Sequence, residues 1–450
     1  MLNSLLGRWA PQNYYRGHAI LVTLALIAVV MTLLSKQLLT PMISRYAEAV
    51  FVLGFVFMVW HHFARLKREP TLWFFALSVI LPPLFFVVNY IIDADMAKAY
   101  FDWERMPRIM LFMAVGWWLG GVEANNIKFL SVAFLGLMIA VLADPMRMSY
   151  LQSIFQGRRV DFGILNAQHV ALYFSITLIG FLSYGPRALK LENSISKVVA
   201  LLFVGFGLMF SALVIIGTQT RAAWLGLLIC LLVWIFLNLK NLMPKGKTLQ
   251  KTVFTFIAAS LLIAGSFLFK DTITKRVTSE SEVIQAIVSG QFDSIPYTSI
   301  GIRLNTWRVA LDRIQERPLT GWGGRVRVDV IQESEMLPQW VKANFGHFHN
   351  TFIEFALGYG WLSVIFIIGL YFWLLIGLKN AVSRGFGSKQ TLHFTGYGML
   401  LFLVMNQFES YLFFWSGIYA TQIMLAPAYS IILASFFNHN APAMNQTSSI

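Results

Sequence analysis

The side chains of this sequence that are best suited to chemistry are an arginine and two histidines. Arg221 ends the run Thr218–Arg221, and His347 and His349 lie in the run His-Phe-His-Asn. A guanidinium can hold a phosphate through paired hydrogen bonds, and an imidazole can accept a proton from a hydroxyl near neutral pH. Taken alone, each of these side chains has a plainer interpretation. The arginine could mark the edge of the membrane, and each histidine could be an ordinary packed residue. Their meaning therefore depends on what positions them.

Acidic residues near the histidines are the next candidates. On a continuous helix, Asn350 and His347 would share a face with Glu354, whereas His349 would be turned about 140° from it. We therefore expect Glu354 to orient the neighbours of His349 rather than to polarise His349 itself. Glu409 is also a candidate, because charged groups near a membrane core are costly and often functional. His169, which follows Gln168 at the start of another apolar stretch, is expected to line the same cavity.

We predict no metal ion and no cofactor. The His-x-His pair has no cysteine or acidic partner at a ligand spacing that indicates zinc. Asp93 and Asp95 are a second metal candidate, because paired carboxylates can hold a divalent cation against pyrophosphate oxygens. A solvated acidic loop is the plainer interpretation of these two residues, so their role stays open. No glycine-rich nucleotide-binding loop is recognisable, which disfavours ATP as a substrate.

The composition indicates that membrane helices position these groups. Of 450 residues, 57% are hydrophobic and 12% are charged, and this balance excludes an ordinary water-soluble enzyme. A spanning helix needs about 20 mostly apolar residues. The sequence therefore predicts an all-α, polytopic integral membrane protein with about twelve transmembrane helices. They are expected at residues 18–34, 46–63, 72–92, 107–122, 127–143, 166–184, 197–217, 222–239, 252–269, 351–378, 394–409 and 415–437.

Charge predicts the orientation of these helices. If the N-terminus is cytoplasmic, the six inside segments hold sixteen of the 35 Lys and Arg residues and three acids. This asymmetry agrees with the excess of positive charge that cytoplasmic loops carry. The formal net charge of +14 therefore indicates topology rather than nucleic-acid binding, which needs positive charge clustered in one groove. We expect a multi-pass protein of the bacterial inner membrane.

The chain divides into four segments on this interpretation. Residues 1–269 hold the first nine transmembrane helices, 270–350 a large periplasmic loop, 351–437 the last three helices, and 438–450 a disordered cytoplasmic tail. Within the loop, helices are expected at 281–287 and 300–316, and the second is followed by Pro318 and a glycine-rich turn. Arg303 and Trp307 share one face of the longer helix, and Arg308 lies on another. An amphipathic helix lying on the membrane is the plainer alternative.

Several of these motifs together resemble the O-antigen ligases of lipopolysaccharide assembly and the wider group that includes O-antigen polymerases and protein O-oligosaccharyltransferases. They are Thr218–Arg221, Gly301-Ile302-Arg303 with Trp307, Pro318–Gly323, and His349-Asn350 with nine residues before Gly360. The resemblance covers the topology of the whole chain, but its specific residues lie between about 218 and 363. One departure is Ser363, which stands where a second glycine is often found.

The resemblance implies an active site facing the periplasm, in a fold similar to type C glycosyltransferases. The donor would be a glycan on undecaprenyl pyrophosphate, and the acceptor would be a sugar hydroxyl of lipid A–core. Membrane lipid would surround the protein. Arg221 and Arg303 would stabilise the leaving diphosphate and His349 would act as the base, in a metal-independent reaction that inverts the anomeric centre. The remaining residues expected to bind substrate are Arg308, His347, Asn350, Glu354, Trp307 and His169.

Two alternatives remain open. A polymerase or a protein oligosaccharyltransferase would use the same chemistry on another acceptor. A membrane transporter would also have about twelve spans, but transporters place ionisable groups near the middle of the membrane. The candidate groups here gather at one face, beside a large loop, which favours an enzyme.

Overall fold

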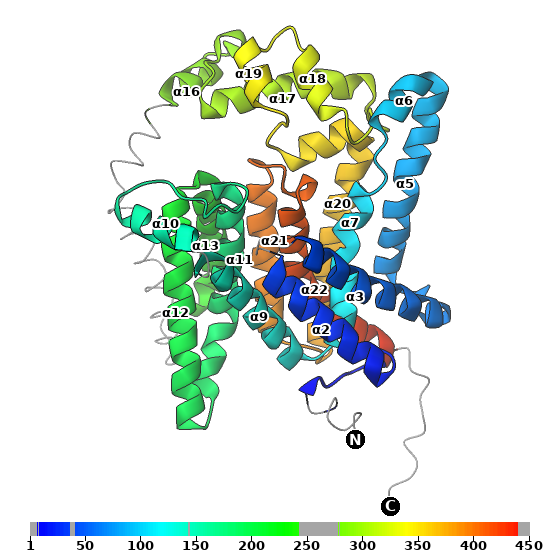
Figure 1. The fold of residues 1–450 in the computed structure, drawn as a ribbon, viewed down its shortest axis with the longest axis vertical. Coiled ribbons are helices and arrows are strands. Elements are labelled where there is room, and N and C mark those ends of the chain that lie inside the picture. Colours follow the sequence, from blue (N-terminus) through cyan, green and yellow to red (C-terminus); the bar gives the residue numbers. More distant parts are fainter. Residues whose placement is uncertain are drawn as a thin grey trace, which may run out of the picture.

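Every regular element of the described chain is a helix, as predicted. The computed structural model describes residues 9–36, 41–142, 145–242 and 280–439, together with Gly7 and Thr278. A bundle of long helices carries a layer of short helices, α16 to α19, at one end (Figure 1). We call residues 280–350, which form this layer, the cap segment.

Ten of the twelve predicted spans coincide with single helices, the span 107–122 is divided into three short elements, and the span 252–269 lies outside the described residues. Among the described residues, eight helices are long and apolar enough to cross a membrane, which indicates a multi-pass membrane protein. Helices α2 and α21 are shorter, with 17 residues each. The count of twelve therefore stays a prediction. The first half of the bundle comprises α2 (Ala19–Ser35), α3 (Pro41–His61), α4 (Phe63–Leu66), α5 (Pro70–Ile92), α6 (Ala94–Tyr100), α7 (Arg105–Arg108), η1 (Ile109–Leu111), α8 (Phe112–Leu119) and α9 (Glu123–Leu142).

The rest of the chain adds the cap segment and the central helices. The bundle continues with α10 (Pro145–Phe155), α11 (Ala167–Tyr184), η2 (Gly185–Lys190), α12 (Ser194–Thr218), α13 (Arg221–Leu242), α20 (Thr351–Ser383), α21 (Lys389–Met405), η4 (Tyr411–Phe413) and α22 (Trp415–His439). The cap segment contains α16 (Ser281–Val288), η3 (Phe292–Ser294), α17 (Ser299–Glu316), α18 (Arg327–Glu333) and α19 (Gln339–Asn344). Helices α16 and α17 lie where the sequence predicts them.

The core of the bundle surrounds α22, which is almost entirely buried, whereas α5 and α12 expose most of their apolar side chains. Exposed apolar surface on a long helix is what contact with lipid requires. The predicted span 107–122 is broken into α7, η1 and α8, and α8 ends at Gly120 with a left-handed φ of 70°. Trp117 and Trp118 of α8 are fully buried against the core.

The glycine-rich turn after α17 is docked on a kink in α20. Gly360 interrupts α20 with φ 70° and ψ 173°. The amides of Trp322 and Gly323 donate to the carbonyls of Leu357 and Gly358, and the amide of Trp361 donates to Pro318, each at 2.8 Å. These bonds satisfy backbone groups that the kink frees from the helix ladder.

Ser363 adds a further interaction at this kink. Its hydroxyl donates to the carbonyls of Phe355 at 2.9 Å and Gly360 at 2.7 Å. A glycine at position 363 could not make these bonds. The departure from the glycine expected there therefore has a local physical reason.

We expect Gly321→Ala to destabilise the protein more than Gly290→Ala. Both glycines have left-handed φ, at 62° and 70°, so both variants carry a strain of about 1–2 kcal/mol. A Cβ at Gly321 would also lie 2.5 Å from the backbone of Gly358 and Tyr359, whereas Gly290 has no atom within 4 Å. Thermal unfolding of the purified variants in detergent measures the difference. Equal loss of stability in the two variants would contradict tight docking of this turn.

Candidate functional site

The two histidines lie in the loop that leads into α20. The helix begins at Thr351, and the Asn350 side chain caps it by accepting hydrogen bonds from the amides of Phe352 and Ile353 at 3.0 and 3.2 Å. Because the helix starts after the histidines, the helical spacing used in the sequence analysis does not apply to His347 and His349. The backbone of His349 has a left-handed φ of 52°, a strained conformation that is common at functional sites.

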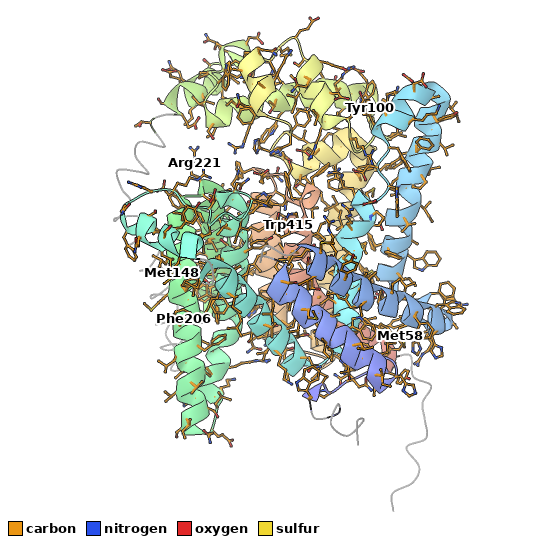
Figure 2. The ribbon with its side chains drawn as sticks, viewed as in Figure 1. Met58, Tyr100, Met148, Phe206, Arg221 and Trp415 are labelled. Atoms are coloured by element: carbon orange, nitrogen blue, oxygen red, sulfur yellow. The ribbon has the colours of Figure 1, made fainter. Side chains whose placement is uncertain are left out.

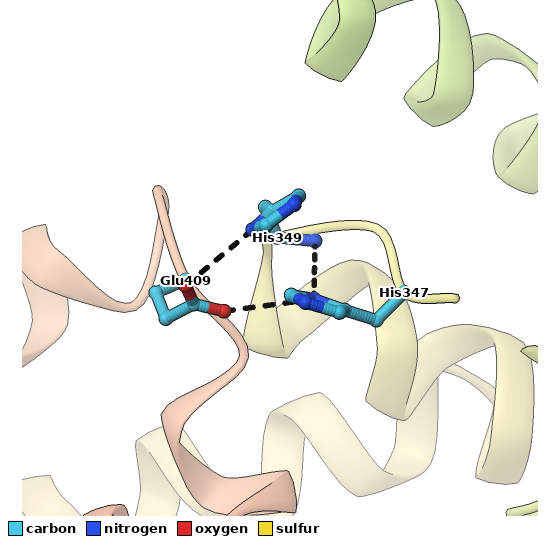
Figure 3. A group of neighbouring side chains, drawn as sticks. All are labelled: His347, His349 and Glu409. Atoms are coloured by element: carbon cyan, nitrogen blue, oxygen red, sulfur yellow. Dashed lines mark hydrogen bonds and ion pairs between the residues drawn. The ribbon is translucent and has the colours of Figure 1, made fainter. Parts of the chain in front are cut away.

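Both histidines contact Glu409, which lies in the loop between α21 and α22 (Figure 3). Its carboxylate oxygens lie 3.5 Å from Nδ1 of His347 and 3.4 Å from Nδ1 of His349. The contact to His349 is an ion-pair contact without hydrogen-bond alignment. Gln168 Nε2 and the amide of Ser410 each donate to the carboxylate at 2.9 Å. The Glu409 side chain is completely buried, whereas those of His347 and His349 are 21% and 15% exposed.

Glu409 keeps its charge despite this burial. Burial raises the pKa of the carboxyl group, but the contacts with His349, His347 and His169 outweigh it and hold the pKa at about 2. The pKa of His347 is lowered, chiefly by burial and then by His349, against the opposing effect of Glu354 and Glu409. A negative charge therefore persists beside two imidazoles.

Glu354 contacts two neighbours of His349, Phe348 and His347. Its carboxylate accepts from the amide of Phe348 at 2.9 Å and from the hydroxyl of Ser410, and it lies 3.8 Å from Nδ1 of His347. Arg327 of α18 pairs with it at 3.0 Å. Glu354 thus joins α18, α20 and the loop before α22 at a fully buried position.

Arg303 and Arg221 approach this cluster from the cap segment and from α13. Arg303 Nη1 donates to the carbonyl and hydroxyl oxygens of Ser299, and its buried Nε has no hydrogen-bond partner among the described residues. Burial lowers the pKa of Arg303, and the charges that act on it include Glu409 and Arg221. Arg221 lies at the end of the bundle that faces the cap segment (Figure 2), 3.3 Å from Glu280. Arg303 therefore has both Glu409 and Arg221 in its electrostatic neighbourhood.

Trp307 and His169 also belong to this neighbourhood. The indole of Trp307 donates to the carbonyl of Phe348 at 2.7 Å, so α17 is tied to the histidine loop. The His169 ring bonds to Ser416 and packs against Tyr411 and Phe414.

Three of the predicted candidates lie elsewhere. Arg308 pairs with Asp293 at 2.7 Å, and the Asp293 side chain is 95% exposed, so this pair belongs to the surface of the cap segment. The expectation that Arg308 joins the site is therefore not supported by its contacts. Asp93 caps α6 through the amide of Met96, and the exposed Asp95 lies 3.9 Å from Lys98. These two carboxylates have local structural roles.

Glu409 is a candidate in the sequence without a predicted role, and Arg327, Ser410 and Glu280 are not among the predicted site residues. Glu409 could be found only as an acidic residue at the end of an apolar stretch. Arg327 is one of several arginines in a charged segment, and only the tertiary contact with Glu354 distinguishes it.

A comparison with protein families gives one match. Residues 206–368, a little over a third of the chain, match the family model described as O-Antigen ligase. This match supports membership of the O-antigen ligase/polymerase family. No curated protein matches the sequence. The matched segment contains Arg221, Arg303 and His349 but ends before Glu409, so the partner of the histidines comes from outside it.

We expect Arg327→Met to destabilise the protein by roughly 3–5 kcal/mol, because it leaves the fully buried Glu354 carboxylate without its cation. Arg308→Met is the matched control, since it removes a surface ion pair and should change stability little. Thermal unfolding in detergent measures both, and the double variant Arg327→Met/Glu354→Gln should recover part of the loss. Equal stability of the two single variants would contradict a structural role for the buried pair.

Proposed function

We propose that the protein is an O-antigen ligase. It transfers an O-antigen glycan from undecaprenyl pyrophosphate to a sugar hydroxyl of lipid A–core. The observation that carries this proposal is the group formed by His349, Glu409 and Arg303, in a chain whose residues 206–368 match the O-antigen ligase family. A base and fixed cations side by side suit attack by an alcohol on a carbon that bears a diphosphate.

The histidine and the two arginines have different roles in the reaction. The acceptor hydroxyl attacks the anomeric carbon and gives its proton to Nε2 of His349, while the bond between that carbon and the diphosphate oxygen breaks. Arg221 and Arg303 stabilise the charge that develops on the departing diphosphate. Attack opposite the leaving group inverts the anomeric centre. No metal is needed in this scheme, because the two guanidinium groups supply the positive charge.

Glu409 positions His349 in this scheme. A carboxylate on the Nδ1 side favours the tautomer that carries its proton on Nδ1, which leaves the lone pair of Nε2 available for the acceptor proton. Catalytic contacts are often long or poorly aligned before substrate binds, as is this 3.4 Å contact.

The proposal includes the location. We place the protein in the inner membrane with about twelve spans and with the cap segment and the histidines facing the periplasm. The distribution of Lys and Arg in the short loops supports this orientation.

The nearest alternatives are an O-antigen polymerase and a protein O-oligosaccharyltransferase, and the lipopolysaccharide of a deletion strain separates them. Loss of a ligase leaves bare core lipid while polymeric glycan accumulates on its carrier. Loss of a polymerase gives core lipid capped with a single repeat. Transfer by purified protein in detergent, with no sealed compartment, excludes a transporter.

We expect His349→Ala, Arg221→Ala and Arg303→Ala each to abolish transfer, because each removes the base or one of the two cations. The assay uses purified protein with a lipid-linked donor and core acceptor, and the wild-type reaction should resist EDTA. Arg313→Ala is the control, since this arginine of α17 pairs with the exposed acids Glu316 and Glu333. Wild-type transfer by well-expressed His349→Ala protein would remove the assignment of the base.

We expect Glu409→Gln to lower kcat by about 10–100-fold with little change in the KM for the donor, because it disturbs the base rather than the diphosphate site. Glu354→Gln should lower kcat less, since Glu354 contacts the neighbours of His349. Glu409→Asp should recover part of the rate. A change confined to the KM for the donor would instead place Glu409 in donor binding.

A further inference from the structure

The group His347, His349 and Glu409 has the geometry of a metal site. One ligand atom of each residue, a ring nitrogen for the histidines and a carboxylate oxygen for Glu409, lies within 4.8 Å of the other two. Nδ1 of His347 is 3.5 Å from one carboxylate oxygen, and Nδ1 of His349 is 3.4 Å from the other. Both distances are longer than an ordinary charge-assisted hydrogen bond. They are close to the roughly 3.3 Å that separates two ligands of a tetrahedral zinc ion with bonds of about 2.0–2.1 Å.

The surroundings of these three side chains support this interpretation. The Nδ1 atom of His349 is buried and accepts or donates no hydrogen bond within the described structure. Gln168 and the amide of Ser410 hold the two oxygens of Glu409, as outer partners of a ligating carboxylate do. The sequence disfavours a metal because the His-x-His pair has no cysteine or acidic partner at a ligand spacing that indicates zinc. The fold supplies one from the loop between α21 and α22.

Two imidazoles and one carboxylate favour zinc among the common divalent ions. Magnesium and calcium prefer oxygen ligands, whereas His₂Glu sets are found in catalytic zinc sites with a fourth position left open. The partly exposed rings of His347 and His349 leave an approach for the ion. Arg303 nearby disfavours a cation, so we expect moderate rather than tight affinity.

We propose that Zn²⁺ binds reversibly to His347, His349 and Glu409 and inhibits transfer. The inhibition rests on the proposed function of His349 as base, whereas the binding does not. Zinc takes the lone pair of Nδ1, so the single proton of the neutral ring moves from Nδ1 to Nε2. An imidazole in that state has no lone pair for the acceptor proton. The bound ion also separates Glu409 from the ring that it positions.

Binding is tested on the purified full-length protein with an affinity tag that contains no histidine. Isothermal titration with Zn²⁺ should give one site per chain, and Co²⁺ should give the visible absorption of a tetrahedral complex. His347→Ala and Glu409→Gln should each lower the affinity at least tenfold. His169→Ala is the matched control, because this nearby histidine bonds to Ser416 instead, and it should keep the affinity. Unchanged affinity in His347→Ala, or equal loss in His169→Ala, would overturn the site.

Inhibition is tested separately in the transfer assay. Zinc should reduce the wild-type rate over the concentration range in which it binds, and EDTA should restore that rate. Binding without loss of activity would overturn the inhibition, and so would a rate that EDTA abolishes and zinc restores. If the wild-type protein shows no transfer under any condition, the proposed function fails, while the titration still decides whether zinc binds.

Discussion

The site depends on one buried negative charge. Glu409 is completely buried, and an ionised carboxylate at such a position needs compensating partners. Four groups provide them: the rings of His347 and His349, the side-chain amide of Gln168 and the backbone N–H of Ser410. They come from α11, from the loop before α20 and from the loop before α22. The need to compensate this charge therefore determines how three parts of the bundle meet.

Three arginines supply the positive charge near the buried acidic residues. Arg327 neutralises Glu354, and Arg221 pairs with Glu280 of the cap segment. Arg303 has a buried nitrogen, Nε, that forms no hydrogen bond within the described residues. An anionic substrate group that reached this point would meet a cation already desolvated by the protein, where electrostatic interactions are stronger than in water.

The sequence predicts the helices well and the contacts among them poorly. Apolar stretches of sufficient length locate the long helices, and α17 is recognisable by its periodicity and by Pro318. The stretch 107–122 ends at the pair Gly120-Gly121, because both residues have a left-handed φ of 70°. The histidines and arginines could be selected by residue type, whereas Glu409 gained its partners only through folding. Pairings between residues sixty or more positions apart follow from packing that no local pattern records.

The docked turn after α17 has a mechanical consequence. Three backbone hydrogen bonds and a pair of closely opposed glycines join residues 318–324 to α20, just beyond the segment that holds Asn350 and Glu354. Trp307 provides a second attachment, to the carbonyl of Phe348. The chain from α17 to the turn is thus anchored at two places, the histidine loop at Phe348 and the kink of α20. A displacement of α17 against the bundle would move the histidine loop and the kink together.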